Sequence, residues 1–294
     1  MSPDDPPFVQ EALRWATELL SGGGLRNPRQ DAELLLSRAM SRDRTFLHAH
    51  PERKLDPSSW KLFSEWVERR LQHFPIQYLI GEQEFYGRRF RVAPGVLIPR
   101  PETEHLVDEA MRTARGIDRP FLLELGTGSG CVAVTLALEL PRARIVATDV
   151  SEQALSIARA NAVELQCAPQ IDFRLSHWFE DFDPRKDRFD LIVSNPPYIG
   201  IEDRQTLDGA VREFEPDEAL FAGPNGLQAY EAILDGASAF LKAKGRLLLE
   251  LGTGQYRAVS RMARRSGWLE TGVCKDLAGR FRCLSLAVAS RAQT

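Results

Sequence analysis

The fold of this chain follows from one stretch of sequence, Phe121-Leu122-Leu123-Glu124-Leu125-Gly126-Thr127-Gly128-Ser129-Gly130. Its first half is a short apolar run, which predicts a buried strand. Its glycines predict a tight turn, and residues 130–140 carry the apolar pattern of a helix. Strand and helix patterns then alternate along the rest of the chain. Continuous apolar strands separated by amphipathic helices are typical of a parallel sheet that is covered on both faces.

Seven strands and five helices are predicted from residue 103 onward. The strands lie at 121–125, 144–148, 171–174, 189–194, 245–250, 268–274 and 283–289. The helices lie at 103–115, 130–140, 151–166, 227–242 and 255–266. The link 275–282 between the last two strands is too short for a crossover helix, which favours an antiparallel hairpin. We therefore predict an α/β fold with a seven-stranded, mostly parallel sheet whose last strand is antiparallel.

The first part of the chain has a different pattern. Residues 8–74 carry apolar residues at helical spacing, interrupted by Gly22-Gly23-Gly24, and show no convincing strand. Further on, Tyr78–Gly81 and Phe85–Val92 have the pattern of short strands around glycine turns. We predict a small helical domain at 1–74, a β-hairpin linker at 75–98 and the α/β domain at 99–294.

The composition excludes several classes of protein. The chain has 294 residues, of which 43% are hydrophobic and 27% are charged, as in ordinary globular proteins. Its apolar runs are far shorter than the ~20 residues of a membrane span, and its first residues lack the pattern of a secretory signal. The net charge of −3 argues against a surface that embraces nucleic acid. The four cysteines show no CxxC spacing, so we expect no zinc site, no disulfide framework and a reducing, cytoplasmic location.

The glycine-rich turn predicts a ligand site at the carboxyl end of its strand. A dinucleotide-binding fingerprint needs a third glycine where this chain has Cys131. The tighter turn, with Glu124 two residues before Gly126, suits instead a nucleoside cofactor with a sulfonium and an amino-acid tail, unless it is simply a strand-to-helix turn. Asp149 ends the next strand, where a carboxylate can accept hydrogen bonds from both ribose hydroxyls of an adenosine. It could also cap the following helix, although Ser151 can do so as well.

A second copy of the turn sequence lies at Leu248–Gly254. In register with the first copy, Gln255 replaces Ser129 and Tyr256 replaces Gly130. A tyrosine would stand where the backbone must approach a ligand. We therefore predict that the second copy only ends a strand of the same sheet.

The most informative four residues are Asn195-Pro196-Pro197-Tyr198, after the predicted strand 189–194. The prolines fix the backbone and remove two amide donors, which leaves the Pro196 carbonyl as an acceptor in a stiff loop. The Asn195 side-chain oxygen is a second acceptor, and Tyr198 offers a flat ring. Together they suit a planar group that carries an NH2. On their own, the same residues would fit a Pro-Pro turn beside an incidental aromatic.

With these elements in place, the chain resembles the class I S-adenosylmethionine-dependent methyltransferases with an N-P-P-Y motif. Among them it is similar to the release-factor glutamine methyltransferases, the PrmC/HemK family. The resemblance covers nearly the whole chain and includes Pro75–Gly87, Leu97–Glu104, the glycine-rich turn, Trp178-Phe179 and the segment from Glu215 to Leu227. Its most specific element is Ile98-Pro99-Arg100-Pro101-Glu102-Thr103-Glu104, since the related methyltransferases of ribosomal protein L3 diverge after Pro-Arg. It implies a Rossmann-like methyltransferase sheet.

The resemblance also implies a reaction and a set of site residues. The reaction is methyl transfer from S-adenosylmethionine to the side-chain amide nitrogen (N5) of the glutamine in the Gly-Gly-Gln motif of class I peptide chain release factors. The implied cofactor contacts are Glu124, Gly126, Thr127, Gly128, Ser129, Gly130, Asp149, Trp178 and Asn195. Substrate binding and catalysis are assigned to Asn195, Pro196, Pro197 and Tyr198, without a metal. Family members often have an acidic residue where this chain has His177, so we expect the adenine to stack on Trp178.

Other functions stay open at this stage. One is a glutamine methyltransferase that acts on ribosomal protein L3, and another is an adenine-N6 methyltransferase, which would need base flipping and a phosphate-binding surface. A third is a catalytically silent cofactor-binding scaffold, against which the intact Asn195–Tyr198 argues. Cys131 disfavours a nicotinamide dehydrogenase. Residues 1–74 carry no catalytic motif, and we expect them to dock the release factor; no membrane or direct nucleic-acid partner is expected.

Overall fold

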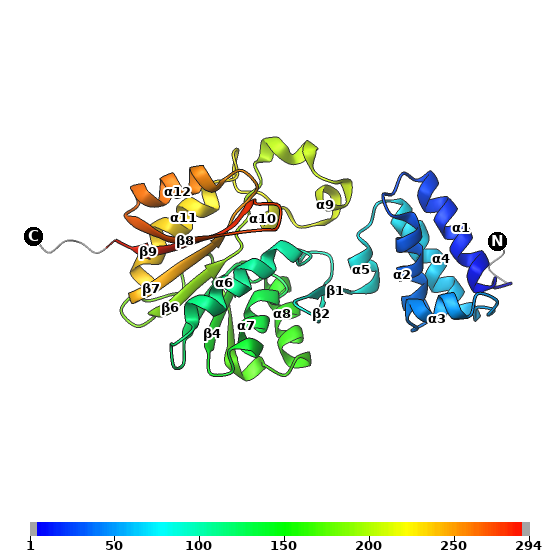
Figure 1. The fold of residues 1–294 in the computed structure, drawn as a ribbon, viewed down its shortest axis with the longest axis horizontal. Coiled ribbons are helices and arrows are strands. Elements are labelled where there is room, and N and C mark those ends of the chain that lie inside the picture. Colours follow the sequence, from blue (N-terminus) through cyan, green and yellow to red (C-terminus); the bar gives the residue numbers. More distant parts are fainter. Residues whose placement is uncertain (1–4, 290–294) are drawn as a thin grey trace, which may run out of the picture. The chain divides into compact units, whose positions relative to one another are not determined.

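The computed structural model describes residues 5–289, which fall into two compact units (Figure 1). The first unit contains the described residues up to Gly81 together with Asp208–Phe214. The second contains Glu82–Leu207 and the described residues from Glu215 onward. Within residues 5–289, no helix has the length and apolar character needed to cross a membrane.

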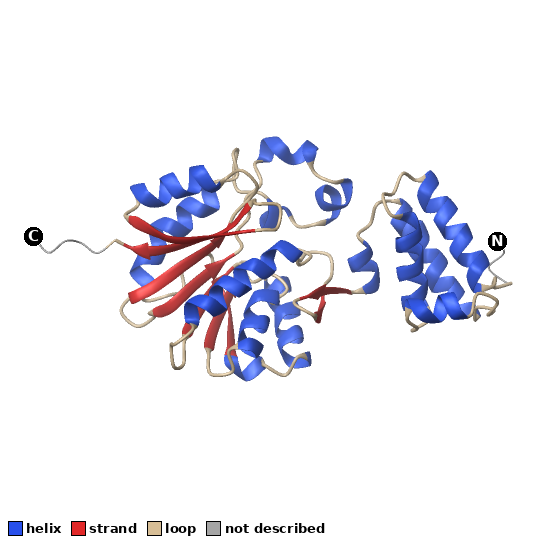
Figure 2. Ribbon diagram, in the orientation of Figure 1, coloured by secondary structure: helices blue, strands red, loops and turns tan. Residues whose placement is uncertain are grey.

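The first unit is built from helices (Figure 2), and the apolar positions of all of them except α9 contribute to one core. They are α1 (Val9–Gly22), α2 (Pro28–Ala39), α3 (Arg44–Ala49), α4 (Pro57–Leu71), α5 (Ile76–Ile80) and α9 (Gly209–Phe214). Leu20, Leu35 and Phe63 are fully buried there. The side chains of Asp43 and Asp56 accept backbone N–H bonds at the starts of α3 and α4, which satisfies donors that a helix leaves free.

The predicted strand at Tyr78–Gly81 is wrong, because this segment belongs to helix α5. Pro75 precedes the helix, and Gly81 ends it with φ +76°, a conformation that glycine adopts at little cost. Ile76 and Leu79 lie three residues apart and are both buried in the core of the first unit. The sequence pattern of a short apolar segment between a proline and a glycine fits a strand or one helical turn equally well. Packing against the core of the first unit determines which of the two forms.

A short segment from late in the chain also belongs to the first unit. The ring of Phe214 in α9 stands edge-on to Phe74, with centroids 5.0 Å apart. Arg26 Nη2 lies 3.5 Å from Asp208 Oδ2. The chain therefore leaves the second unit after Leu207 and returns to it at Glu215.

The second unit is a seven-stranded sheet with the order β5-β4-β3-β6-β7-β9-β8. Its strands are β3 (Phe121–Leu125), β4 (Arg144–Asp149), β5 (Ile171–Leu175), β6 (Phe189–Ser194), β7 (Leu241–Glu250), β8 (Trp268–Lys275) and β9 (Phe281–Val288). The pairs from β5 to β7 are parallel, and β9 runs antiparallel to both β7 and β8. The predicted mostly parallel sheet with an antiparallel last strand is confirmed. A separate antiparallel hairpin, β1 (Glu82–Phe85) and β2 (Arg88–Arg91), precedes it.

Alternating residues of the strands face different layers of helices, as a period of two requires. Leu122, Ile145 and Leu191 share one core with α6 (Glu104–Ala114), α7 (Cys131–Glu139) and α8 (Glu152–Glu164). Leu123, Val146 and Ile192 share the other with α11 (Gln228–Ala237) and α12 (Tyr256–Arg265). The shorter elements are η1 (Pro101–Thr103), η2 (Ala168–Gln170), η3 (Ile201–Thr206), α10 (Asp217–Leu220) and η4 (Ser238–Phe240). The carboxyl ends of β3, β4 and β6 meet at one edge, where open α/β sheets bind ligands.

Two details differ from the sequence predictions. Strand β7 begins at Leu241, because α11 ends at Ala237 and does not continue to residue 242. The sequence predicted no disulfide framework, and the structure has one disulfide among the described residues, between Cys274 and Cys283. These two residues are direct partners in the antiparallel register of β8 and β9. Strand register brings them together, and cysteine spacing alone does not reveal it.

Candidate active site

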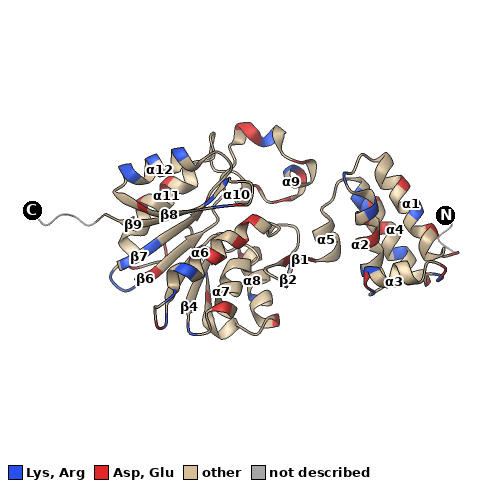
Figure 3. Ribbon diagram, viewed as in Figure 1, with Lys and Arg blue, Asp and Glu red and all other residues tan. Residues whose placement is uncertain are grey.

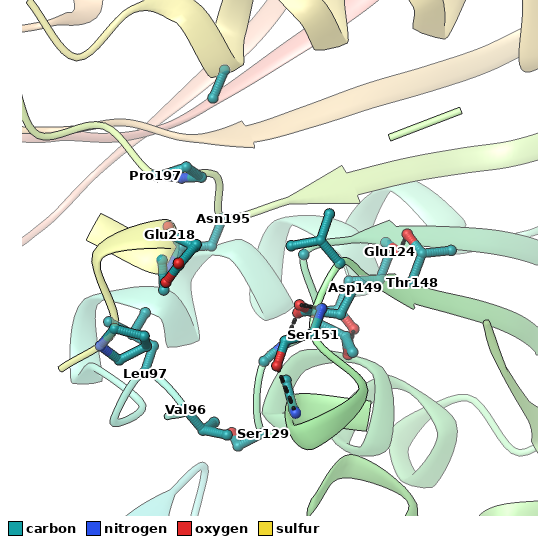
Figure 4. Close-up of a pocket in the computed structure, with 18 of the residues that line it drawn as sticks. Val96, Leu97, Glu124, Ser129, Thr148, Asp149, Ser151, Asn195, Pro197 and Glu218 are labelled. Carbon is teal, nitrogen blue, oxygen red and sulfur yellow. Dashed lines mark hydrogen bonds between the residues drawn. The ribbon is translucent and has the colours of Figure 1, made fainter. Parts of the chain in front are cut away.

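A cavity of about 770 Å3 lies in the second unit, in the size range of small-ligand sites. Its walls come from the carboxyl ends of β3 and β4, residues 176–178, the start of the loop after β6, the segment 95–103 and residues 216–232. Figure 4 shows Asn195 and Pro197 on the loop after β6, and Asp149 and Ser151 at the end of β4. The structure thus brings the two motifs that the sequence singled out to one site.

The glycines of the first turn have two different tasks. Gly126 and Gly128 have φ values of +72° and +54°, and both line the cavity. A Cβ atom at either position would have no heavy atom within 4 Å, so the bare backbone faces open space. Gly130 is not among the lining residues, and a Cβ there would lie 2.9 Å from Ala158 Cβ. Gly130 therefore allows α7 to pack closely on α8, and its predicted cofactor contact stays a prediction.

Glu124 holds the turn together from inside the protein. Its Oε2 accepts hydrogen bonds from Thr127 Oγ1 at 2.6 Å and from the Ala133 amide at 3.0 Å. Burial raises the pKa of Glu124 from 4.5 to about 8, against the opposing effect of these two bonds. Since the bonds join the turn to the first residues of α7, Glu124 shapes the cavity wall.

Asp149 bridges the ends of β3 and β4. Its Oδ2 accepts the Gly128 amide at 2.8 Å. Its Oδ1 accepts the Ser151 amide at 3.0 Å, and both of these residues are labelled in Figure 4. Ser151 Oγ accepts the Ala154 amide at 3.2 Å, so Ser151 is the cap of α8. Burial raises the pKa of Asp149, while the backbone N–H bonds lower it. Each carboxylate oxygen can accept a further bond, so Asp149 can also bind a ligand hydroxyl.

His177 and Trp178 contribute another part of the wall. Trp178 has φ +51°, a left-handed backbone conformation that is rare for a large residue. The ring packs against the core that contains α11 and α12. His177 Nδ1 lies 2.9 Å from Glu180 Oε1, so a carboxylate stands beside the histidine.

The Asn195–Tyr198 loop divides between the cavity and the protein interior. Asn195 and Pro197 line the cavity, whereas Pro196 and Tyr198 are not among the described lining residues. Pro196 is buried, and Tyr198 packs against the core that contains α11 and α12. Substrate contact by Pro196 and Tyr198 therefore stays a prediction.

No site role was predicted for the segment before α6, although its motif carried the resemblance. Asn195 Nδ2 donates to Thr103 Oγ1 at 3.1 Å, and both residues line the cavity. Arg100 Nη2 lies 2.5 Å from Oε1 of the buried Glu215, whose Oε2 accepts the Ile98 amide at 3.2 Å. The motif therefore forms a wall of the cavity. Among residues 5–289, no group of three or more His, Cys, Asp or Glu side chains is placed to hold a metal ion.

Comparison with known proteins gives matches along nearly the whole chain. Residues 11–81 match the family described as "PrmC N-terminal domain", and residues 104–214 match the "Methyltransferase small domain". A release factor glutamine methyltransferase of Cereibacter sphaeroides is 42% identical over 94% of this chain and 96% of its own length. One of Koribacter versatilis is 40% identical over 92% and 95%. A solved ribosomal protein L11 methylase of Lactobacillus delbrueckii has a TM-score of 0.49 at 18% identity and covers 70% of this chain and 90% of that one.

Proposed function

Because the chain belongs to the release factor glutamine methyltransferases, we propose that it methylates the side-chain amide nitrogen (N5) of the glutamine in the Gly-Gly-Gln motif of class I peptide chain release factors, with S-adenosylmethionine as donor. One observation carries the proposal. Asn195 lines the same cavity as Asp149 and the open backbone at Gly126 and Gly128. The side chain proposed to bind the substrate amide and the residues proposed to bind the nucleoside therefore line the same cavity.

The residues of the cavity fit S-adenosylmethionine. Side chains at Gly126 and Gly128 would project into the cavity, so their absence leaves room for a ligand against the backbone. Asp149 has acceptor capacity left for the ribose hydroxyls, and the Trp178 ring offers an apolar surface for the adenine. When bound, the donor supplies a methyl group on a positively charged sulfur.

The chemical difficulty lies with the substrate, because an amide nitrogen shares its lone pair with the carbonyl group. Asn195 Oδ1 and the Pro196 carbonyl accept the two N–H bonds of the glutamine amide. Both acceptors bind more strongly as positive charge develops on that nitrogen, which stabilises the transition state. The stiff Pro-Pro backbone keeps the acceptors in place, which adds the advantage of positioning. Proton release is left to water or to the same acceptors.

The charge around the cavity favours a protein substrate over nucleic acid. Arg100 is the one Lys or Arg among the described lining residues, and Glu215 neutralises it. Arginines gather on α12, as Figure 3 shows, but α12 does not line the cavity. A flipped adenine would need phosphate contacts beside the cavity. A cytoplasmic location, where translation takes place, belongs to the same proposal.

The helical unit is proposed to dock the release factor. One glutamine side chain buries too little surface to select a protein, because a stable interface takes ~800 Å2 per partner. The described residues of the first unit have their own core, and none of them lines the cavity. Its exposed helices are therefore available for a second contact.

Methyl-labelled S-adenosylmethionine tests the proposal against its rivals. The protein is incubated separately with purified release factor, ribosomal protein L3 and DNA. The proposal predicts label in the release factor alone. Label in L3 or DNA would support the corresponding rival, and bound donor without any transfer would support a silent scaffold.

A further inference from the structure

The amino-acid tail of S-adenosylmethionine carries an ammonium group and a carboxylate, and no residue has been named for either. In the proposed function the ribose lies against Asp149, the adenine against Trp178 and the substrate amide against Asn195, and all three residues line the cavity. The tail therefore lies in the part of the cavity that these residues leave free. A carboxylate that leaves water needs a cation or hydrogen-bond donors in its place.

The charged side chains of the cavity wall are mostly acidic. Asp149 and Glu218 line it together with the buried Glu124 (Figure 4), and Arg100 is the one Lys or Arg among the described lining residues. The sulfonium and ammonium groups of the donor are cations, which carboxylates attract. The tail carboxylate is the one anionic group of the donor, so its charge is complementary to that of Arg100.

His177 is the other described lining residue whose side chain can carry a positive charge. Its Nδ1 lies 2.9 Å from Glu180 Oε1, so a carboxylate of the protein already stands beside it. It also precedes Trp178, in the part of the wall that is proposed for the adenine. The adenine and the tail are opposite ends of the donor, so His177 is a poor partner for the tail.

Glu215 fixes the Arg100 guanidinium from the protein interior. The Glu215 side chain is 1% exposed, against 30% for Arg100. Arg100 Nη2 lies 2.5 Å from Glu215 Oε1, and Glu215 Oε2 accepts the Ile98 amide at 3.2 Å. Both carboxylate oxygens are therefore bonded to the segment that carries Arg100. A charge-assisted bond to a buried, doubly bonded carboxylate keeps the guanidinium in one place.

Arg100 keeps hydrogen-bond donors for a ligand. A guanidinium has five N–H groups in a planar fork, a geometry that matches a carboxylate. The bond to Glu215 is the one hydrogen bond that the Arg100 side chain donates within residues 5–289. Because Glu215 balances its charge, the pair repels a ligand with a net positive charge less than a lone arginine would. A fixed guanidinium with free N–H groups thus suits the carboxylate of a cationic donor.

The position of Arg100 is consistent with the tail end of the donor. Arg100 immediately precedes η1, and Thr103 at the end of η1 accepts a hydrogen bond from Asn195, which follows β6. Asp149 ends β4, and β3 lies between β4 and β6 in the sheet. The ribose and the tail lie on opposite sides of the donor sulfur. A donor with its ribose on Asp149 therefore has its tail on the side of β6.

We propose that Arg100 binds the carboxylate of the amino-acid tail of S-adenosylmethionine. This inference rests on the proposed function, which makes S-adenosylmethionine the donor. It gives the Ile98–Glu104 motif, which carried the resemblance, a role in cofactor binding.

Two ligands that differ in the tail test the inference in the full-length protein. S-adenosylhomocysteine has the tail, 5′-methylthioadenosine lacks it, and neither has a net charge near neutral pH. We expect the wild type to bind S-adenosylhomocysteine more tightly. Arg100→Met should weaken its binding at least tenfold, the scale of one hydrogen bond between charged groups, and leave the affinity for 5′-methylthioadenosine unchanged. Isothermal titration calorimetry measures both affinities.

Two further variants control for folding and for charge. Arg100→Met leaves the buried Glu215 without its partner, which destabilises the fold. The double variant Arg100→Met/Glu215→Gln removes both charges and should show the same selective loss. Arg204 forms an ion pair with Asp217, and neither residue is among the described lining residues. Arg204→Met should therefore keep both affinities.

An NMR signal tests the contact independently of affinity. The Nε–Hε resonance of Arg100 is identified by its loss in Arg100→Met. We expect it to shift when S-adenosylhomocysteine binds and much less when 5′-methylthioadenosine binds.

Four results would overturn the inference. They are a wild type that binds S-adenosylhomocysteine no more tightly than 5′-methylthioadenosine, an unchanged or increased affinity for S-adenosylhomocysteine in the folded variants without Arg100, an equal loss for both ligands, and an Arg100 resonance that responds equally to both. If the wild type methylates no release factor, the proposed function fails, and the two ligands still decide the inference.

Discussion

The backbone amide of Gly128 donates to Oδ2 of Asp149 at 2.8 Å, which ties the turn after β3 to the end of the neighbouring strand β4. Asp149 therefore has a structural role, which is to hold the glycine-rich turn in place, besides any role in ligand binding. The two residues were predicted as separate cofactor contacts, and in the structure they are joined by this hydrogen bond.

Replacement of Asp149 tests the ribose contact. Asp149→Ala should weaken S-adenosylmethionine binding by ~1.5–3 kcal/mol, the scale of hydrogen bonds to a charged acceptor. Asp149→Asn keeps one oxygen for the Gly128 amide and should lose less. Isothermal titration calorimetry measures both affinities, and thermal unfolding shows that the variants fold. Wild-type affinity in a folded Asp149→Ala protein would refute the ribose assignment.

Two glycines of one turn should respond differently to the same change. Gly128→Ala places a methyl group in the cavity, so it should abolish most donor binding. It also places an alanine at a positive φ, which costs ~1–2 kcal/mol of strain. Gly130→Ala drives a methyl group against Ala158, so it should lower the stability of the fold more than Gly128→Ala does. Calorimetric titration and thermal unfolding separate the two effects. If Gly128→Ala binds the donor normally, the open backbone there is not part of the cofactor site.

Asn195 should act mainly in the chemical step. Asn195→Ala should lower kcat by ~100-fold or more, by analogy with the loss of one positioned hydrogen-bonding group in an active site. Asn195→Asp keeps an acceptor but adds charge, so partial activity is expected. Steady-state kinetics with the release factor as substrate measure kcat and KM separately. Wild-type turnover in Asn195→Ala would mean that the Asn195–Tyr198 motif only shapes the loop.

Removal of residues 1–74 tests docking by the helical unit. The KM for intact release factor should rise at least tenfold, a loss of ~1.4 kcal/mol, while a short Gly-Gly-Gln peptide should be much less affected. Because Phe74 packs on Phe214 in α9, the truncated protein needs a check of folding, for which donor binding serves. An equal effect on peptide and intact protein would identify the unit as a stabilising cap.

The sheet could be predicted from the sequence because its signals are local. The apolar run Phe121–Leu125 predicts a buried strand by itself. The short link before β9 predicts that β9 is antiparallel, and neither prediction needs the rest of the chain. Contacts that depend on the packing of the whole fold could not be predicted from the sequence. Helix α9 belongs to the first unit through Phe74, and the Cys274–Cys283 bond follows from strand register.

The candidate site likewise contains residues that could be predicted from the sequence and residues that could not. The turn residues, Asp149 and Asn195 could be placed together because parallel strands end at one edge of the sheet. The hydrogen bond between Asn195 and Thr103 could not, since the two residues lie on different elements far apart in the sequence and meet only in the folded protein. Gly130 could not be given its packing task from the sequence, because a glycine required by helix packing has the same pattern as one required by a ligand.

The position of the transferred methyl group decides whether the proposed reaction takes place. Release factor treated with this protein and S-adenosylmethionine is digested, and the peptide that contains the Gly-Gly-Gln motif is sequenced by mass spectrometry. We expect one added methyl group on the side-chain amide of that glutamine, and no addition with Asn195→Ala over the same time. A methyl group on any other residue, or an unmodified glutamine in the presence of a protein that binds the donor, would show that the protein does not catalyse this reaction.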